Sequence, residues 1–272
     1  MPAATRRRTI TRAAVKVPEI TAAFWVIKVL TTGGGEAASD YLASVSLVLA
    51  ATIGFAGFAA ALALQLRMRR HVPWVYWSAV SAVAVFGTMA ADAVHVVLGV
   101  PYAVTTIAYA AAVAGAFLVW HRLERTLDIH TVTSGRREAL YWVTVLATFA
   151  LGTAVGDLSA FTLHLGYWAS AVLYGVLIAV PALAGWRLRL DPVLAFWSAY
   201  VLTRPLGASL ADWLGKPTWK SGLGFGDGTV TLVAAVAIIV LVALLSRRSS
   251  AVPINEDEDG QAELLPGSGS SG

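Results

Sequence analysis

The sequence contains no cysteine and few charged residues, and each shortage excludes whole classes of protein. Without cysteine the chain forms no disulfide, offers no thiolate to a metal and has no cysteine nucleophile. Charged residues make up 13% of the chain, whereas a soluble domain carries about 25%. HExxH, GxSxG and P-loop motifs are also missing from the sequence. We therefore expect a protein that is neither soluble nor an enzyme, and that has no cofactor beyond a bound cation.

The sequence contains long runs of apolar residues, with few charged residues between them. Each is long enough to cross a hydrocarbon core of about 30 Å, and none alternates as the strands of a membrane barrel do. Because unpaired backbone groups are not tolerated in lipid, such segments must be helical. The sequence therefore predicts an all-α integral membrane protein with eight transmembrane helices. They lie approximately at residues 18–40, 43–66, 73–97, 101–121, 138–160, 163–186, 192–213 and 228–246.

Basic residues gather at one end of the predicted helices. Of the 20 lysines and arginines, 16 flank this end, and only Lys216 and Lys220 are placed in a loop at the other end. By the positive-inside rule the basic end is cytoplasmic, so both termini are predicted inside a multi-pass inner-membrane protein. The basic composition needs no nucleic-acid partner, because the lipid bilayer accounts for it. The 16 residues are Arg6, Arg7, Arg8, Arg12, Lys16, Arg67, Arg69, Arg70, Arg122, Arg125, Arg136, Arg137, Arg187, Arg189, Arg247 and Arg248.

An internal repeat organises the chain. The pattern [FY]-W-x9-G-x4-D occurs four times without a gap, with tryptophan at 25, 77, 142 and 197. Every copy runs in the same direction, so the repeats are predicted to be parallel and pseudo-symmetric, each with two helices. Their predicted bounds are 18–70, 71–126, 137–190 and 191–248, between a basic segment at 1–17 and a disordered acidic tail at 249–272. No cleavable signal peptide is predicted, and residues 267–272 look like an expression linker.

The repeat resembles a known family. The stretches KVPEITAAFWVIKVLTTGGGEAASDYL, YWVTVLATFALGTAVGD and FWSAYVLTRPLGASLAD are similar to bacterial uncharacterised membrane-anchored proteins. These proteins carry four copies of a two-helix repeat of unknown function, marked by a tryptophan. The resemblance covers roughly residues 16–248 and implies the architecture, but no activity.

The repeated tryptophans and glycines have structural explanations. A tryptophan near the start of a transmembrane helix is typical of the aromatic belt at the membrane interface. A glycine ten residues later allows two membrane helices to pack closely. A hinge or an ion-lining role is the alternative for the glycines.

The repeated aspartates allow two readings. Asp40, Asp92, Asp157 and Asp212 lie late in the odd-numbered helices, where a carboxylate faces the unfavourable end of the helix dipole. Each aspartate could cap the following helix by accepting backbone N–H bonds. Alternatively, four parallel repeats arranged around one axis would bring equivalent aspartates together. In that case the residues one helical turn earlier share the same face.

Convergence of the aspartates would create a site for a hard divalent cation. The predicted metal-site residues also include two histidines, which are alternatively polar residues at the interface. Clustered carboxylates bind cations and protons in competition, which predicts transport coupled to protons. The candidate ligands are Glu36, Asp40, Asp92, Asp157, Asp212, Thr88, Thr153, His95 and His164.

Two basic residues inside the predicted spans suggest a second reading. Lys28 and Arg204 each precede an acidic residue by eight positions, so either could form a neutralising ion pair or contact a substrate. The main expectation is a divalent-cation transporter. The alternatives are a transporter of a small organic solute, and a scaffold or sensor that transports nothing. Residues proposed for gating or substrate contact are Lys28, Arg204, Tyr102, Tyr109, Tyr167 and Tyr174.

Overall fold

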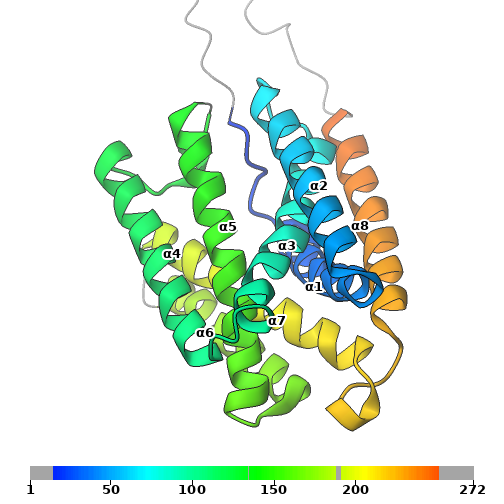
Figure 1. Ribbon diagram of the computed structural model, residues 1–272. Coiled ribbons are helices and arrows are strands. Elements are labelled where there is room, and N and C mark those ends of the chain that lie inside the picture. Colours follow the sequence, from blue (N-terminus) through cyan, green and yellow to red (C-terminus); the bar gives the residue numbers. More distant parts are fainter. Residues whose placement is uncertain (1–14, 134, 188–190, 251–272) are drawn as a thin grey trace, which may run out of the picture.

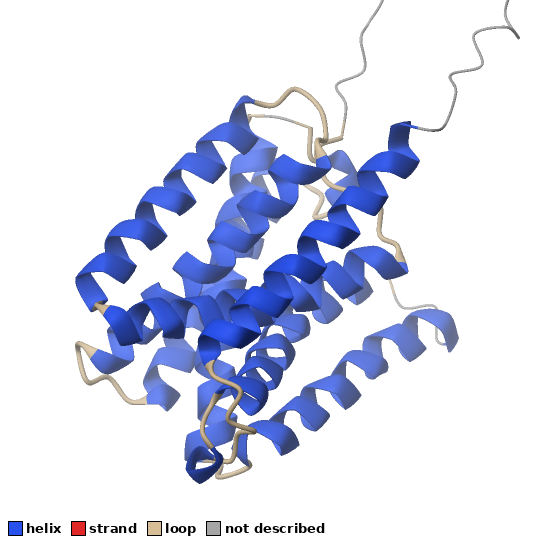
Figure 2. Ribbon diagram, turned by 90° about the vertical axis from the view of Figure 1, so that its right-hand side faces the viewer, coloured by secondary structure: helices blue, strands red, loops and turns tan. Residues whose placement is uncertain are grey.

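The computed structural model describes residues 15–133, 135–187 and 191–250. Most of these residues lie in helices joined by loops, with no strand among them, as Figure 2 shows. Most of the predicted basic segment at 1–17 and of the acidic tail at 249–272 lies outside the described residues, as does Arg189. The eight α-helices of the described part are α1 (Ala22–Val45), α2 (Leu47–Arg67), α3 (Pro73–Val96), α4 (Tyr102–Glu124), α5 (Arg136–Asp157), α6 (Gly166–Arg187), α7 (Pro192–Gly215) and α8 (Asp227–Ser250).

The odd-numbered helices form a closed inner ring. Contacts run from α1 to α3, α3 to α5, α5 to α7 and α7 back to α1. Each even-numbered helix packs mainly on the odd-numbered helix of the next repeat, so that α2 covers α3, α4 covers α5, α6 covers α7 and α8 covers α1 (Figure 1). The repeats are therefore interlocked around one axis, and a single repeat leaves its apolar faces uncovered.

Five of the helices in the described residues are long and apolar enough to cross a membrane, namely α2, α3, α4, α5 with its extension, and α8. The apolar part of α6 is shorter, from Gly166 to Val180. The inner helices α1 and α7 carry the buried charged residues of the core, which lowers their hydropathy. Because neighbouring helices cover them, they need not be uniformly apolar.

Aromatic side chains close one end of the inner ring, here called the aromatic end. The aromatic residue before each repeated tryptophan contacts the tryptophan of the next repeat. The ring centroids are 5.6 Å apart for Phe24 and Trp77, 5.8 Å for Tyr76 and Trp142, 6.2 Å for Tyr141 and Trp197, and 5.7 Å for Phe196 and Trp25. The predicted interface belt is thus wrong for Trp77, Trp142 and Trp197, which are buried in the core.

The repeated glycines lie where neighbouring inner helices cross. A Cβ added to Gly35 would overlap Ala84, and one added to Gly87 would overlap Phe149. Gly152 faces Arg204 and Gly207 faces Thr32 in the same way. Each glycine therefore opposes the residue seven positions after the tryptophan in the next repeat. This confirms the packing role predicted for the glycines.

The segment before α1 seals the aromatic end with a buried ion pair. The Nζ of Lys16 lies 2.5 Å from Oε2 of Glu138, and the other carboxylate oxygen, Oε1, accepts a hydrogen bond of 3.1 Å from Gln65. The backbone N–H of Lys16 donates to the carbonyl of Val132. The described start of the chain and the end of α8 lie at this same end of the bundle (Figure 1).

Candidate functional site

A polar layer joins all four repeats in the middle of the ring. The guanidinium of Arg204 from the fourth repeat donates to Glu36 of the first repeat at 2.8 Å and to Thr153 of the third at 2.9 Å. It also donates to Thr88 of the second repeat and to the carbonyl of Thr32. We call Arg204, Glu36, Thr88 and Thr153 the arginine layer. Since Arg204 is only 1% exposed, this layer closes the axis of the ring.

The arginine layer uses the positions that were expected to lie beside the aspartates. Glu36, Thr88 and Thr153 occupy the place one turn before the repeated aspartate, where the fourth repeat has Ala208. Arg204, one turn earlier on α7, supplies the charge that Ala208 cannot. The ion pair therefore links two different repeats, rather than Arg204 and the Asp212 of its own helix.

Lys28 lies one layer closer to the aromatic end and is held by aromatic rings. Its ammonium is 4.1 Å from the ring centre of Phe149 and 4.0 Å from that of Tyr200. No carboxylate forms an ion pair with Lys28 among the described residues. Cation–π contacts of this kind stabilise a desolvated charge by roughly 2 kcal/mol. Lys28 is therefore buried among aromatic side chains, with 1% of its surface exposed.

An acidic cavity opens on the other side of the arginine layer, at what we call the acidic end. Its volume is about 430 Å³. All four repeated aspartates line it together with Glu36, so the structure brings these five carboxylates into one space. Tyr102, Tyr167 and Phe161 form an aromatic part of the wall. The five acidic residues are Glu36, Asp40, Asp92, Asp157 and Asp212.

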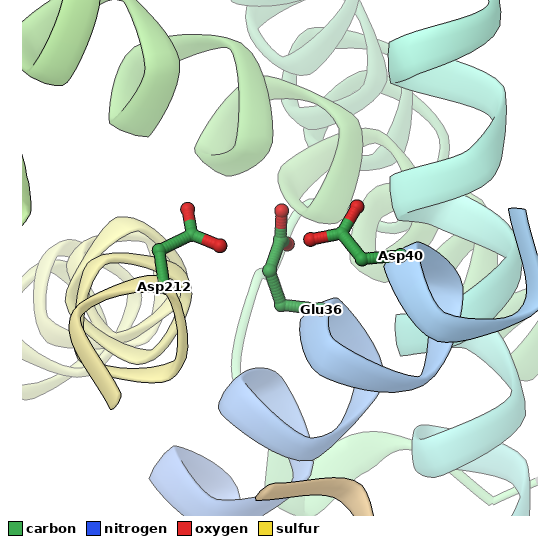
Figure 3. Close-up of side chains that lie close together, drawn as sticks. All are labelled: Glu36, Asp40 and Asp212. Atoms are coloured by element: carbon green, nitrogen blue, oxygen red, sulfur yellow. The ribbon is translucent and has the colours of Figure 1, made fainter. Parts of the chain in front are cut away.

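Three of these carboxylates are close enough to share one cation. Carboxylate oxygens of Glu36, Asp40 and Asp212 all lie within 4.8 Å of one another. Figure 3 shows the three side chains pointing toward each other, two from α1 and one from α7. Glu36 also accepts hydrogen bonds from Arg204 and Thr88, so it connects this acidic group with the arginine layer.

The ammonium of Lys216 lies among the same carboxylates. Its Nζ lies 2.6 Å from Asp40, 3.1 Å from Asp227 and 3.8 Å from Asp212. Burial lowers the pKa of Lys216, but the adjacent carboxylates of Asp40 and Asp212 outweigh it and hold the pKa above its ordinary value. The ammonium therefore remains charged at neutral pH.

Asp92 and Asp157 form the uncompensated side of the cavity. Neither carboxylate makes a hydrogen bond or ion pair within the described ranges, whereas Asp40 and Asp212 face Lys216. The prediction that the aspartates cap the next helix is wrong. Ser46 caps α2 by accepting the N–H of Leu49, and Asp40 lies within α1.

The predicted histidine ligands lie outside the cavity. The ring of His95 stacks on Tyr102, and its Nδ1 is 2.7 Å from the carbonyl oxygen of Val100. His164 is exposed in the turn before α6, with a positive φ of 55°. Neither residue belongs to the cavity wall. Thr88 and Thr153 are likewise bound within the arginine layer.

The four predicted tyrosines divide into two pairs. Tyr102 and Tyr167 line the cavity. Tyr109 and Tyr174 instead donate to the carbonyls of Ala90 and Val155. In both cases the acceptor lies two residues before the repeated aspartate, so these tyrosines hold an even-numbered helix onto the helix that precedes it.

Lys216 is the residue that sequence reasoning missed, because it was placed in an outer loop. One signal was present: Lys216 follows Asp212 by four residues, a spacing at which helical side chains meet. Its contacts with Asp40 and Asp227 have no such signal, since they depend on how α1 and α8 meet α7.

The fold and the cavity together define a helical tandem-repeat protein with apolar, potentially membrane-spanning helices and an acidic internal cavity. The family model described as "Repeat of Unknown Function (DUF347)" matches residues 23–71, 75–126, 140–190 and 195–250. The chain therefore belongs to this repeat family, which confirms the resemblance inferred from the sequence. Searches of curated proteins and of solved structures gave no match.

Proposed function

We propose that the protein is a multi-pass transport protein of the inner cell membrane that moves a divalent metal cation through the acidic cavity. The observation that carries the proposal is the meeting of five carboxylates in one cavity, with oxygens of Glu36, Asp40 and Asp212 within 4.8 Å of one another. Carboxylate oxygens are the ligands that hard divalent cations prefer. The positive-inside pattern supports an orientation with both termini in the cytoplasm and the cavity toward the outer face.

Proton coupling follows from the same cluster. Carboxylates that lie this close together remain ionised only when cations compensate them, so protons and metal ions compete for the site. The arginine layer separates the cavity from the aromatic end. A transport cycle therefore requires that Glu36 leave Arg204, and a cation bound to Glu36 would favour that step by weakening the ion pair.

The two alternative functions have less support. A carrier of an organic solute that uses Arg204 needs a cavity that reaches its guanidinium, whereas Arg204 is sealed by Glu36, Thr88 and Thr153. A scaffold in which each aspartate only caps a helix does not require the carboxylates to meet. Their convergence in a cavity costs electrostatic free energy that a structural repeat has no reason to maintain.

Thermal unfolding of the purified protein in detergent tests the proposal. Mg²⁺, Ca²⁺, Mn²⁺ and Zn²⁺ are added separately, and at least one should raise the melting temperature. At a hundredfold excess over Kd, ligand binding stabilises a protein by about 2.7 kcal/mol. The same cation should enter liposomes containing the protein, as measured with an enclosed metal-sensitive dye.

Asp40→Asn and Asp212→Asn should abolish both responses while the protein still folds, because each removes one of the three carboxylates that could share the cation. Glu19→Gln is the matched control, because this exposed carboxylate lies near the aromatic end and outside the cavity. A melting temperature that ignores all four cations would reject the proposed function.

A further inference from the structure

The backbone around Lys216 is held firmly, while its side chain remains partly free. Residues after α7 turn back and donate to its last carbonyls, from Leu223 to Trp213, from Phe225 to Leu214 and from Gly226 to Gly215. The N–H of Gly224 donates to the carbonyl of Lys216 itself. These bonds satisfy acceptors that a helix end otherwise leaves unpaired. The side chain of Lys216 keeps 17% of its surface exposed.

The ammonium of Lys216 and a metal ion at the three clustered carboxylates would need the same space. The Nζ lies 2.6 Å from Asp40 and 3.8 Å from Asp212, two of the three residues whose oxygens could share a cation. Divalent metals bind carboxylate oxygens at roughly 2.0–2.6 Å. A metal held by Asp40 and Asp212 would therefore displace the ammonium through both contact and charge repulsion.

We propose that Lys216 is a tethered cation that occupies the acidic site when it is empty and swings out when the transported cation binds. This inference rests on the proposed function, which it extends by naming how the empty site is neutralised. The hydrogen-bonded backbone keeps the ammonium within reach, and rotation of the partly exposed side chain releases it without refolding the loop.

Lys220 provides a matched control on the same loop. It also lines the cavity, but its ammonium lies over the ring of Trp219 at 4.9 Å from the ring centre. No ion pair of Lys220 occurs in the described part of the chain. Lys220→Met therefore removes a nearby positive charge without removing an occupant of the acidic site.

The first experiment measures Mn²⁺ affinity by calorimetry for the wild-type protein, Lys216→Met and Lys220→Met. Removing a competing ligand from the site should tighten Mn²⁺ binding about tenfold or more in Lys216→Met, within the range usual for coupled ligands. Lys220→Met should bind Mn²⁺ as the wild-type protein does. Without metal, Lys216→Met should melt at a lower temperature, and Mn²⁺ should restore it.

A second experiment uses the unmodified protein, so that it does not depend on folding of a variant. Brief acetylation of lysines is followed by mass spectrometry with and without Mn²⁺. Modification of Lys216 should rise when Mn²⁺ is bound, and modification of Lys220 should stay constant.

The outcomes separate the inference from the function on which it rests. If Lys216→Met binds Mn²⁺ with wild-type or weaker affinity while the wild-type protein binds it, Lys216 is not a competitor and the inference fails alone. If Lys216→Met binds Mn²⁺ and the wild-type protein does not, the lysine is the occupant that excludes the metal. If no variant binds Mn²⁺ or any other divalent cation, the proposed function is rejected together with the inference.

Discussion

The arginine layer and the acidic cavity are neighbouring levels of one ring, yet they differ in almost every physical property. In the arginine layer, each repeat contributes one polar group, and the guanidinium of Arg204 binds the other three. In the cavity, each repeat contributes an aspartate, and among the described residues only Lys216 forms ion pairs with these aspartates. Where the four repeats carry different residues, in the arginine layer, the ring is sealed. Where all four carry aspartate, the ring contains an open, charged cavity.

The comparison between the arginine layer and the acidic cavity shows how sequence differences among the four repeats change the packing of the ring. Four identical acids around an axis repel one another and leave a space that water or a cation fills. In the arginine layer, the equivalent positions hold one acid, two threonines and one alanine, and Arg204 fills the space between them. Substitutions at the two levels, and at the glycines between the helices, should therefore differ in their cost to the stability of the protein.

Arg204→Met should cause the largest loss of stability, because it leaves Glu36 buried without its cation. Breaking one partner of a buried ion pair costs about 3–5 kcal/mol. Thermal and denaturant unfolding in detergent would measure the loss. The double variant Glu36→Gln with Arg204→Met should recover part of it, since no charge then remains unpaired in this layer. Equal stability of Arg204→Met and the wild-type protein would refute the role of the arginine layer in holding the four repeats together.

Gly35→Ala should have the next largest effect. The added methyl group would overlap Ala84 and approach the backbone of α3, so the two helices would have to separate. Overpacking of this kind costs about 1–3 kcal/mol. Gly57→Ala and Gly115→Ala are the controls, because both positions are helical and have open space around the added atom. These controls should stabilise the protein by about 0.5–1 kcal/mol, measured by the same unfolding assay.

Thr88→Val should destabilise the protein by about 1–2 kcal/mol, because its hydroxyl both donates to Glu36 and accepts from Arg204. Thr153→Val should cost less, since within the described residues the hydroxyl of Thr153 has only the bond with Arg204. Comparison of the two melting temperatures would show whether the layer acts as a network or as independent bonds. A larger loss for Thr153→Val would contradict this assignment.

Asp92→Asn should have the smallest effect on the free energy of unfolding, and it should stabilise the protein where the substitutions in the arginine layer and at Gly35 destabilise it. The carboxylate of Asp92 has no partner in the described chain and lies near the other acids of the cavity. Removing its charge should therefore change the free energy of unfolding by less than about 1 kcal/mol, and toward greater stability in buffer without divalent cations. A large loss in that buffer would mean that Asp92 has a structural partner, and the contrast between the two levels would fail.

The repeat itself was visible in the sequence because spacing survives duplication. The [FY]-W-x9-G-x4-D pattern indicated the number of repeats and their common direction, and the long apolar runs indicated that the segments are helical. It also indicated that the four aspartates could meet, because parallel repeats around an axis place equivalent residues together. The packing role of the glycines followed from the same pattern, since only a residue without Cβ allows such close crossings.

Tertiary structure decided which side chains meet across repeats. Arg204 pairs with Glu36, 168 positions away, and not with an acid on its own helix. Three of the repeated tryptophans lie inside the aromatic ring rather than at a membrane interface, because each is covered by the next repeat. Lys216 reaches the acidic group because the C-terminal ends of α1 and α7 lie beside the start of α8. A sequence pattern shows which side chains lie on each face of a helix. The side chain that lies opposite depends on how the helices pack, and in this protein the interlocking of four diverged repeats determines it.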